Sequence, residues 1–497
     1  MLQGTGSDVG KTVLVAGLCR LARRKGLRVK PFKPQNMSNN AAVADQPLLD
    51  GEAGGEIGGE IGGEMGGEIG RAQWLQALAC GVAPTTDMNP VLLKPQSETG
   101  SQIVVHGKVW GAAKGRDYQK LKPQLMDAVM TSFNRLGEDC DLVIVEGAGS
   151  AAEINLRAGD IANMGFATEA NVPVVLVADI DRGGVIASLV GTYTILPAAD
   201  RDMVCGYLIN KFRGDASLFE EGLAQITGFT GWTGLGVVPY IYETMKLPAE
   251  DSVALEKSAP ASGDGVVVAV PTLSRIANFD DLDPIKQTPG VRLVFVRPGE
   301  AWPQDARLVV LPGSKSTIAD LNQFKDLGWD VELLNHVARG GHVLGICGGY
   351  QMLGHVVRDP DAIEGTQTEA RGLGLLDVET VLIPQKTVMN RSAVDAESGE
   401  SLSGYEIHMG RTSGPGTDRP MIRLDGRDEG AISDDGRVRG SYLHGLFTSD
   451  GWRNAFLSGI GIENSAMNYR ENVEAALDAL ADQLERVIDP AIWDIPA

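Results

Sequence analysis

Short apolar runs alternate with helical patterns along most of this chain. Four runs rich in β-branched residues lie in its first half, at 29–32, 142–145, 173–178 and 204–209, and four more lie at 266–270, 292–296, 308–311 and 343–346. Such alternation is typical of parallel sheets whose strands are connected by helices. We therefore expect an α/β fold in which each domain is a mostly parallel sheet flanked by helices.

A segment rich in proline, alanine, serine and charge interrupts this pattern at 248–265. Composition of that kind is typical of a linker. We therefore divide the 497 residues into a first domain at 1–250, a linker at 251–265 and a second domain at 266–497. Apolar residues near the end recur at spacings of three and four, which predicts one amphipathic helix that we assign to the second domain; they are Val473, Leu477, Leu480, Leu484 and Val487.

The charge and the cysteines exclude several classes of protein. The chain has 44 Lys and Arg against 65 Asp and Glu, a net charge of −21, which disfavours nucleic acid and anionic membranes as partners. No apolar run reaches the roughly 18 residues of a membrane helix, and the first residues lack the pattern of a secretory signal. Five widely spaced cysteines indicate a reducing compartment. We expect a cytoplasmic protein, and the sequence predicts no particular oligomeric state.

Residues 54–69 repeat a unit of two glycines, a glutamate and an apolar residue four times. A period of four fits no common solenoid, and the glycines oppose both helix and strand. We interpret the tract as a flexible expansion of one useful unit.

A glycine-rich segment precedes the first helical run and resembles a phosphate-binding loop. It comprises Gly4, Thr5, Gly6, Ser7, Asp8, Gly10, Lys11 and Thr12. Backbone N–H groups at a helix N-terminus bind phosphate, a lysine adds charge, and a threonine hydroxyl can hold Mg²⁺. The segment is one residue longer than the strict motif, so it is a variant, and a helix cap without chemical role is the alternative. Only Met1–Gln3 precede it, so we expect either that the first strand is truncated or that this start codon lies downstream of the true one.

Polar residues follow three of the predicted strands. Glu146 ends the strand at 142–145, Asp179 and Asp181 follow the next one, and Asn210 and Lys211 follow the third. Ligands bind at the carboxyl edge of parallel sheets. We therefore predict Glu146 as a Mg²⁺ ligand and Asn210 and Lys211 as contacts for a purine.

A cysteine in the second half has the setting of a nucleophile. Cys347 lies between a strand and a helix, with glycines at 345, 348 and 349 that permit a strained turn. A helix N-terminus lowers the pKa of such a thiol. His444, which follows a short strand, is the favoured base, and His408 is the alternative. A thiolate and an imidazole together predict acyl transfer through a thioester.

The order of these motifs resembles the cobyric acid synthase family, the glutamine-hydrolysing amidotransferases of cobalamin synthesis. The resemblance rests on QGTGSDVGKT (3–12), KPFKPQNMSNN (30–40), GGEIGRAQ (66–73), NKFRGD (210–215), LPGSKST (311–317), GICGGYQMLG (345–354) and YLHGLF (442–447). It implies a P-loop fold of the dethiobiotin-synthetase type followed by a class I glutamine amidotransferase domain.

The resemblance also implies a reaction. Cys347 would attack the side-chain amide of glutamine, His444 would move the protons, and backbone N–H groups at Gly313 and Gly348 would form the oxyanion hole. Lys11, Thr12 and Glu146 would hold ATP and Mg²⁺ while a corrinoid carboxylate attacks the γ-phosphate, and ammonia would then displace phosphate. The family amidates the b, d, e and g carboxylates of adenosylcobyrinic acid a,c-diamide.

Two features depart from the family pattern. The acid usually found two residues after the histidine is replaced by Leu446, which leaves the group that orients His444 unidentified. Of the four repeat units only the one at 66–69 adjoins the sequence Gly-Arg-Ala-Gln, so Glu68 is the predicted functional glutamate and a candidate metal ligand.

Candidate substrate contacts are Lys33, Asn36, Ser38 and Asn40, for which an ordinary polar loop is the alternative. The alternative functions are cobyrinic acid a,c-diamide synthase, a MinD-like P-loop ATPase that binds partner proteins, and a non-catalytic remnant. The segments at 33–40 and 311–317 favour the cobyric acid synthases over the first of these.

Overall fold

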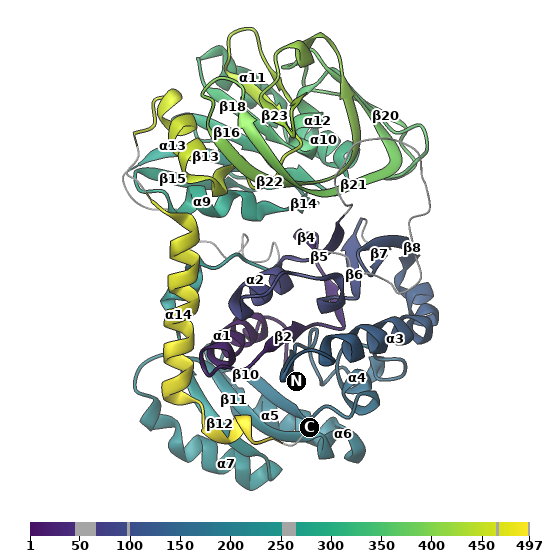
Figure 1. Cartoon of the computed structure of the whole chain (residues 1–497), viewed down its shortest axis with the longest axis vertical. Coiled ribbons are helices and arrows are strands. Elements are labelled where there is room, and N and C mark those ends of the chain that lie inside the picture. Colours follow the sequence, from purple (N-terminus) through teal and green to yellow (C-terminus); the bar gives the residue numbers. More distant parts are fainter. Residues whose placement is uncertain (45–65, 97–99, 251–264, 464–466, 496–497) are drawn as a thin grey trace.

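The computed structural model describes residues 1–497 except 45–65, 97–99, 251–264, 464–466 and 496–497. Two α/β regions lie one above the other (Figure 1), and the expected fold class is confirmed. The predicted linker at 251–265, apart from its last residue, and three of the four repeat units, at 54–65, lie outside the described residues. Among the described residues, no helix is both long and apolar enough to cross a membrane.

The first region is built on a parallel sheet. Its strands are β1 (Leu2–Gly4), β2 (Val29–Phe32), β9 (Leu142–Val145), β10 (Val174–Asp179), β11 (Val204–Phe212) and β12 (Thr233–Pro239). A bridge between Leu2 and Glu146 brings β9 beside β1, so the strand order is β2-β9-β1-β10-β11-β12. β10 is buried along its whole length, as expected for an interior strand covered on both faces. β1 has three residues, all buried.

Helices and two small sheets surround this sheet. The helices are α1 (Lys11–Arg24), α2 (Arg71–Cys80), α3 (Gly115–Gly137), α4 (Met164–Glu169), α5 (Val185–Ile195), α6 (Ala198–Asp202) and α7 (Glu220–Thr230). One small sheet has β3 (Gln35–Met37), β6 (Val91–Pro95), β7 (Gly100–Val105) and β8 (Lys108–Lys114), and the other has β4 (Ala41–Ala44) and β5 (Gly67–Gly70). Both small sheets lie on the side of the second region (Figure 1).

The second region has a parallel sheet of its own. Its order is β15 (Val291–Val296), β13 (Val266–Pro271), β16 (Leu308–Leu311), β18 (His342–Ile346) and β26 (Val438–Ser441), with β25 (Ala431–Ile432) antiparallel at the edge. A short antiparallel pair, β14 (Ile276–Ala277) and β17 (Gly313–Ser314), lies beside it. The helices are α9 (Asp283–Gln287), α10 (Thr317–Asp326), α11 (Trp329–Ala338), α12 (Gly348–Leu353) and α13 (Asp450–Gly459).

A second, mostly antiparallel sheet in this region was not predicted. It comprises β19 (Val356–Arg358), β20 (Glu369–Arg371), β21 (Glu379–Asp395), β22 (Ser401–Ser413), β23 (Ile422–Leu424) and β24 (Arg427–Glu429). The long hairpin β21–β22 faces the first region, and its Val388 and Ile407 share an apolar cluster with Val43 and Leu92 of that region. The hairpin therefore supplies much of the surface that joins the two regions.

The C-terminal helix α14 (Tyr469–Val487) packs on the first region, although the sequence analysis assigned it to the second. Its Leu480 and Leu484 are fully buried in one core with α1. α1 has a glycine at this contact, where a Cβ on Gly17 would lie 2.5 Å from Leu484 Cδ1. Arg20 of α1 also pairs with Glu474. Figure 1 shows α14 running from the second region along the side of the first, so it ties the two together.

Candidate active sites

Cys347 occupies a strained turn between β18 and α12. Its φ of 51° and ψ of −107° lie where non-glycine residues are rare. The next two residues must be glycines because neighbouring backbone leaves no room for a side chain. A Cβ on Gly348 would lie 2.7 Å from Ser314 N, and one on Gly349 would lie 2.1 Å from Leu311 O. The sequence therefore folds locally into the kind of elbow that presents a nucleophile at the end of a strand.

His444 is held by a carboxylate that the sequence analysis did not identify. Its Nδ1 lies 2.7 Å from Oδ2 of Asp281, and the N–H of Gly445 donates to Oδ1 of the same residue at 2.6 Å. The two side chains are only 2% and 3% exposed. Asp281 therefore takes the place of the missing acid at Leu446.

Burial by itself lowers the pKa of His444, but Asp281 and Cys347 more than offset this effect and raise the pKa to about 10. The Cys347 side chain therefore lies close enough to His444 to interact with it, and its Sγ lies 3.7 Å from Ile407 O. An imidazolium beside a thiol stabilises the thiolate, which is the nucleophilic form. The raised pKa therefore keeps His444 in its imidazolium form at neutral pH.

The strand pair β14–β17 brings Asp281 to this site. Ala277 pairs with Gly313, and the chain turns directly from β14 into the segment that carries Asp281. Gly313 in turn lies against the histidine, because a Cβ on it would be 3.1 Å from His444 Cε1. Of the predicted oxyanion residues, Gly313 thus lies beside His444, and Gly348 directly follows Cys347 and lies against Ser314. In the sequence, this acid could have been found from the cluster of three aspartates at 280, 281 and 283.

His408, the alternative base, is engaged elsewhere. Its Nδ1 lies 3.0 Å from Gly410 O and its Nε2 lies 3.3 Å from Glu406 Oε1. Its ring stacks on Tyr442 with the ring centroids 3.9 Å apart. The geometry therefore favours His444 as the base.

The glycine-rich loop of the first region forms the start of α1. Gly10 has a φ of 92°, and a Cβ there would lie 2.3 Å from Asn210 Nδ2. Lys11 Nζ donates to Gly149 O at 2.8 Å across the loop. Burial lowers the pKa of Lys11, although Glu146 raises it. The loop thus combines helix N–H groups with a buried lysine, as phosphate binding requires.

Asn210 and Lys211 hold the loop itself. Asn210 Nδ2 donates to Val9 O at 2.8 Å, and Lys211 contacts the carbonyl of Asp8. Lys211 also lies 2.9 Å from Asp179 Oδ2. These contacts place the predicted purine residues at the edge of the phosphate loop, with Asp179 beside them.

Thr12 and Glu146 meet at the other side of the loop. Thr12 Oγ1 donates to Glu146 Oε1 at 2.7 Å, and Gln76 Nε2 donates to Oε2 at 2.6 Å. Lys33 Nζ lies 2.8 Å from Oε1. A hydroxyl and a carboxylate are oxygen donors that suit Mg²⁺, which binds one or two carboxylates and takes its other ligands from phosphates and water. No group of three His, Cys, Asp or Glu in the described ranges is arranged to hold a metal by itself.

Both regions match known family models. Residues 1–254 match the CobQ/CobB/MinD/ParA nucleotide binding domain, and residues 267–452 match the CobB/CobQ-like glutamine amidotransferase domain. The cobyric acid synthase of Brucella suis biovar 1 (strain 1330) is 62% identical over 489 residues, 98% of this chain and 97% of that protein. The cobyric acid synthase of Sinorhizobium fredii (strain NBRC 101917 / NGR234) is 62% identical over 491 residues, which are 99% of this chain and 98% of that protein. The chain belongs to the cobyric acid synthase family.

The family resemblance drawn from the sequence is thereby confirmed. The first region is the nucleotide-binding domain of a cobyric acid synthase family member, and the second is its amidotransferase domain. A solved structure described as a glutamine amidotransferase covers 40% of this chain and all of its own length, with 21% identity and a TM-score of 0.31.

Glu68 joins the two domains of this cobyric acid synthase family member. It is fully buried, and its Oε1 and Oε2 lie 2.8 Å from Lys94 Nζ and 2.6 Å from Lys386 Nζ. Burial alone would raise the pKa of Glu68, but the two lysines hold it well below its usual range. Because both carboxylate oxygens are engaged by lysines, these contacts do not support the predicted metal role. Lys386 belongs to β21 of the second domain, so its ion pair with Glu68 connects the two domains.

The four candidate substrate residues are buried and have partners. Lys33 pairs with Glu146 and Glu250, and Asn36 Nδ2 donates to Gln73 Oε1 at 3.0 Å. Ser38 and Asn40 donate to the carbonyls of Glu250 and Ala249, each at 2.9 Å. Lys33, Ser38 and Asn40 thus hold the end of the nucleotide-binding domain against the phosphate site, whereas Asn36 contacts α2.

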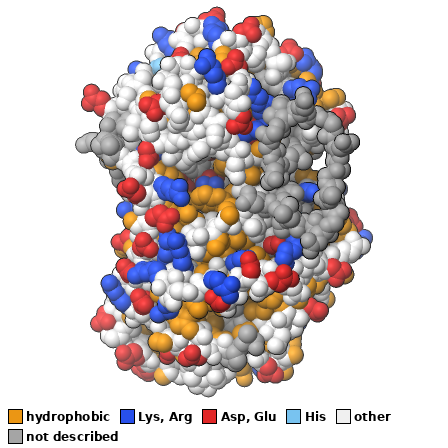
Figure 2. Space-filling view, viewed as in Figure 1, with side chains coloured by type: hydrophobic (Ala, Val, Ile, Leu, Met, Phe, Trp, Pro, Cys, Tyr) orange, Lys and Arg blue, Asp and Glu red, His pale blue; other side chains and the backbone are white. Residues whose placement is uncertain are grey.

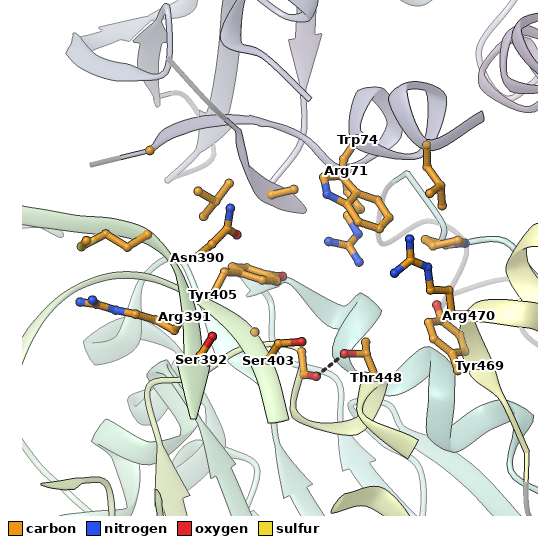
Figure 3. A pocket seen from close by; sticks show the side chains of 18 of the residues that line it. Arg71, Trp74, Asn390, Arg391, Ser392, Ser403, Tyr405, Thr448, Tyr469 and Arg470 are labelled. Atoms are coloured by element: carbon orange, nitrogen blue, oxygen red, sulfur yellow. Dashed lines mark hydrogen bonds between the residues drawn. The ribbon is translucent and has the colours of Figure 1, made fainter. Parts of the chain in front are cut away.

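A cavity of about 780 Å³ lies between the two domains. Figure 3 shows aromatic and cationic side chains around it from α2, β21, β22 and α14; they include Arg71, Trp74, Arg391, Tyr405, Tyr469 and Arg470. In the view of Figure 2, hydrophobic side chains gather at the middle of the molecule, between surfaces where both signs of charge are mixed. The cavity is thus lined by aromatic rings and by arginines, two of which, Arg71 and Arg391, pair with carboxylates.

Proposed function

We propose that this protein makes cobyric acid. It would amidate the b, d, e and g carboxylates of adenosylcobyrinic acid a,c-diamide, using ATP and glutamine. The observation that carries the proposal is identity of 62% over 98% of the chain to a cobyric acid synthase. Two built sites support it: Cys347 with His444 and Asp281, and the loop at Lys11 with Thr12 and Glu146.

Glutamine hydrolysis would begin with attack of the Cys347 thiolate on the amide carbon. His444 then gives its proton to the amide nitrogen, the carbon–nitrogen bond breaks, and ammonia leaves a thioester on Cys347. Water attacks the thioester, His444 takes its proton, and glutamate and the thiolate are released. Asp281 holds Nδ1 of the ring so that the other nitrogen serves Cys347, as in catalytic triads. The N–H of Gly348 and the backbone at Gly313 would stabilise the oxyanion.

Amide formation would take place at the phosphate site. A corrinoid carboxylate is a poor acylating agent, so it first attacks the γ-phosphate of ATP, and ADP leaves. Ammonia then attacks the acyl phosphate, and phosphate leaves with formation of the amide. The loop N–H groups and Lys11 bind the phosphates, while Gln76 and Lys33 fix the carboxylate of Glu146. Thr12 and Glu146 would hold Mg²⁺, which supplies charge neutralisation at the transferred phosphate.

The cavity between the domains is our candidate for the corrinoid site. Trp74, Tyr405 and Tyr469 offer flat apolar surfaces for a macrocycle, and arginines suit its carboxylates. Lys33, which lies beside Thr12 and Glu146, is the candidate contact for the reacting carboxylate. For Asn36, Ser38 and Asn40 we propose a supporting role through their contacts with Gln73, Glu250 and Ala249.

The test is amidation of adenosylcobyrinic acid a,c-diamide with ATP, Mg²⁺ and glutamine, followed by mass spectrometry. Four replacements of hydroxyl by amino group support the proposal, and none refutes it. One control reaction omits ATP, and another supplies ammonium in place of glutamine. Amidation of cobyrinic acid that stops at the a,c-diamide would indicate the diamide synthase, and absence of glutamine hydrolysis would favour a MinD-like ATPase.

A further inference from the structure

We propose that Arg71, in the nucleotide-binding domain, is a positioning residue for glutamine hydrolysis in the other domain. Arg71 forms an ion pair with Asp280. This ion pair fixes the segment that also carries Asp281, the acid that holds His444. This inference rests on the proposed function only in that glutamine is taken as the nitrogen donor.

The ion pair crosses the domain interface and is buried. Arg71 Nη2 lies 3.0 Å from Asp280 Oδ2, and the side chains are 7% and 3% exposed. Burial raises the pKa of Asp280 to about 6 even though Arg71 lowers it. Without Arg71 a buried carboxylate beside Asp281 would lose its cationic partner, and such a group takes up a proton or moves toward water.

Arg71 also supports the ring that stacks on His444. The rings of Tyr405 and His444 are 5.2 Å apart at 16°, and their backbones exchange hydrogen bonds of 2.8 and 3.1 Å. The guanidinium carbon of Arg71 is 5.9 Å from the centre of the Tyr405 ring. Figure 3 shows Arg71 reaching from α2 beneath Trp74 toward the amidotransferase domain. The acid segment and the stacking partner of His444 therefore both adjoin one arginine.

The helix that carries Arg71 also reaches the phosphate site. Gln76 on α2 donates to Glu146 Oε2 at 2.6 Å and to the carbonyl of Thr12 at 3.3 Å. α2 has ten residues, and a helix of that length is a rigid connection. The short helix α2 thus connects Glu146, the carboxylate of the phosphate site, with the segment that carries Asp281, the acid of the glutaminase site.

The experiment compares Arg71→Met, Arg71→Lys and Arg20→Met. Arg20 is the matched control, because its side chain is also 7% exposed and pairs with a carboxylate, Glu474, on another element. Glutamine hydrolysis is measured without corrinoid, so that contact of Arg71 with the acceptor does not enter. We expect kcat of Arg71→Met to fall about 10-fold to 100-fold, as for a small misplacement of a catalytic group, with KM for glutamine unchanged. Arg71→Lys should recover part of the loss, and Arg20→Met should keep the wild-type kcat.

Asp280→Asn provides the second test. It should reproduce the fall in kcat, and the double variant with Arg71→Met should be no slower than the slower single variant. The proposal would be overturned if the kcat losses of the two single variants multiply in the double variant. It would also be overturned by an unchanged kcat in Arg71→Met or by an equal loss of kcat in Arg20→Met. Amidation of the corrinoid with ammonium by the wild type is measured separately. Its failure would count against the proposed function while the hydrolysis series still decides the role of Arg71.

Discussion

Replacing Asp281 with asparagine tests the catalytic geometry most directly. The substitution keeps the shape of the side chain but removes the charge that faces His444 Nδ1 at 2.7 Å. The pKa of His444 is raised from 6.5 to about 10 in the folded protein. That difference corresponds to about 5 kcal/mol in favour of the imidazolium, which is what remains of the attraction by Asp281 and Cys347 after the opposing cost of burial.

The variant should lose most of its glutamine hydrolysis. Asparagine in place of a triad aspartate lowers kcat by about 10⁴ in serine proteases, and we expect about 10³ to 10⁴ here because the same role is removed. Release of glutamate from glutamine measures this loss. Amidation with ammonium should be retained, because the phosphate site keeps Lys11 and Glu146.

The matched control is Asp283→Asn, two residues away. Burial raises the pKa of Asp283 to about 8, so this side chain is largely protonated at neutral pH and an amide resembles it. Its kcat should stay near the wild-type value. A kcat for Asp281→Asn within tenfold of wild type, or loss of ammonium-dependent amidation as well, would refute the role assigned to Asp281.

The same pair predicts how stability depends on pH. Because folding raises the pKa of His444, its contribution is complete below about pH 6.5 and is lost as the pH rises toward 10. The difference in unfolding free energy between wild type and Asp281→Asn should therefore shrink over that range, as followed by denaturant unfolding. A difference that grows with pH would contradict the ion pair.

Three further substitutions separate the remaining roles. Glu68→Gln breaks the buried pair with Lys94 and Lys386, which should destabilise the protein by about 3–5 kcal/mol in denaturant unfolding, whereas an unchanged stability with weaker Mg²⁺ binding would restore the metal role. Glu146→Gln should abolish amidation with either nitrogen donor while glutamine hydrolysis without acceptor continues; retained amidation would contradict the metal-ligand assignment. His408→Gln should leave the kcat of glutamine hydrolysis within tenfold of wild type, and a loss as large as that of His444→Gln would make His408 the base.

The sequence by itself was sufficient wherever a function depends on local geometry. The elbow at Cys347 follows from glycines whose missing Cβ atoms leave room for neighbouring backbone, and the start of α1 follows from Gly10 at positive φ. The strands at 29–32 and 142–145 are found where apolar runs predict them. Burial and turn geometry are encoded in neighbouring residues, so patterns of a few residues suffice to find them.

Only the tertiary structure decided which distant groups become partners. The acid that holds His444 comes from Asp281, which lies far upstream and arrives through the pairing of β14 with β17. Glu68 meets Lys386 across the domain interface, and α14 packs on α1 although it follows the second domain in the chain. An amphipathic stripe or a buried carboxylate requires a partner but does not specify which one, because the partner is selected by packing between segments far apart in sequence.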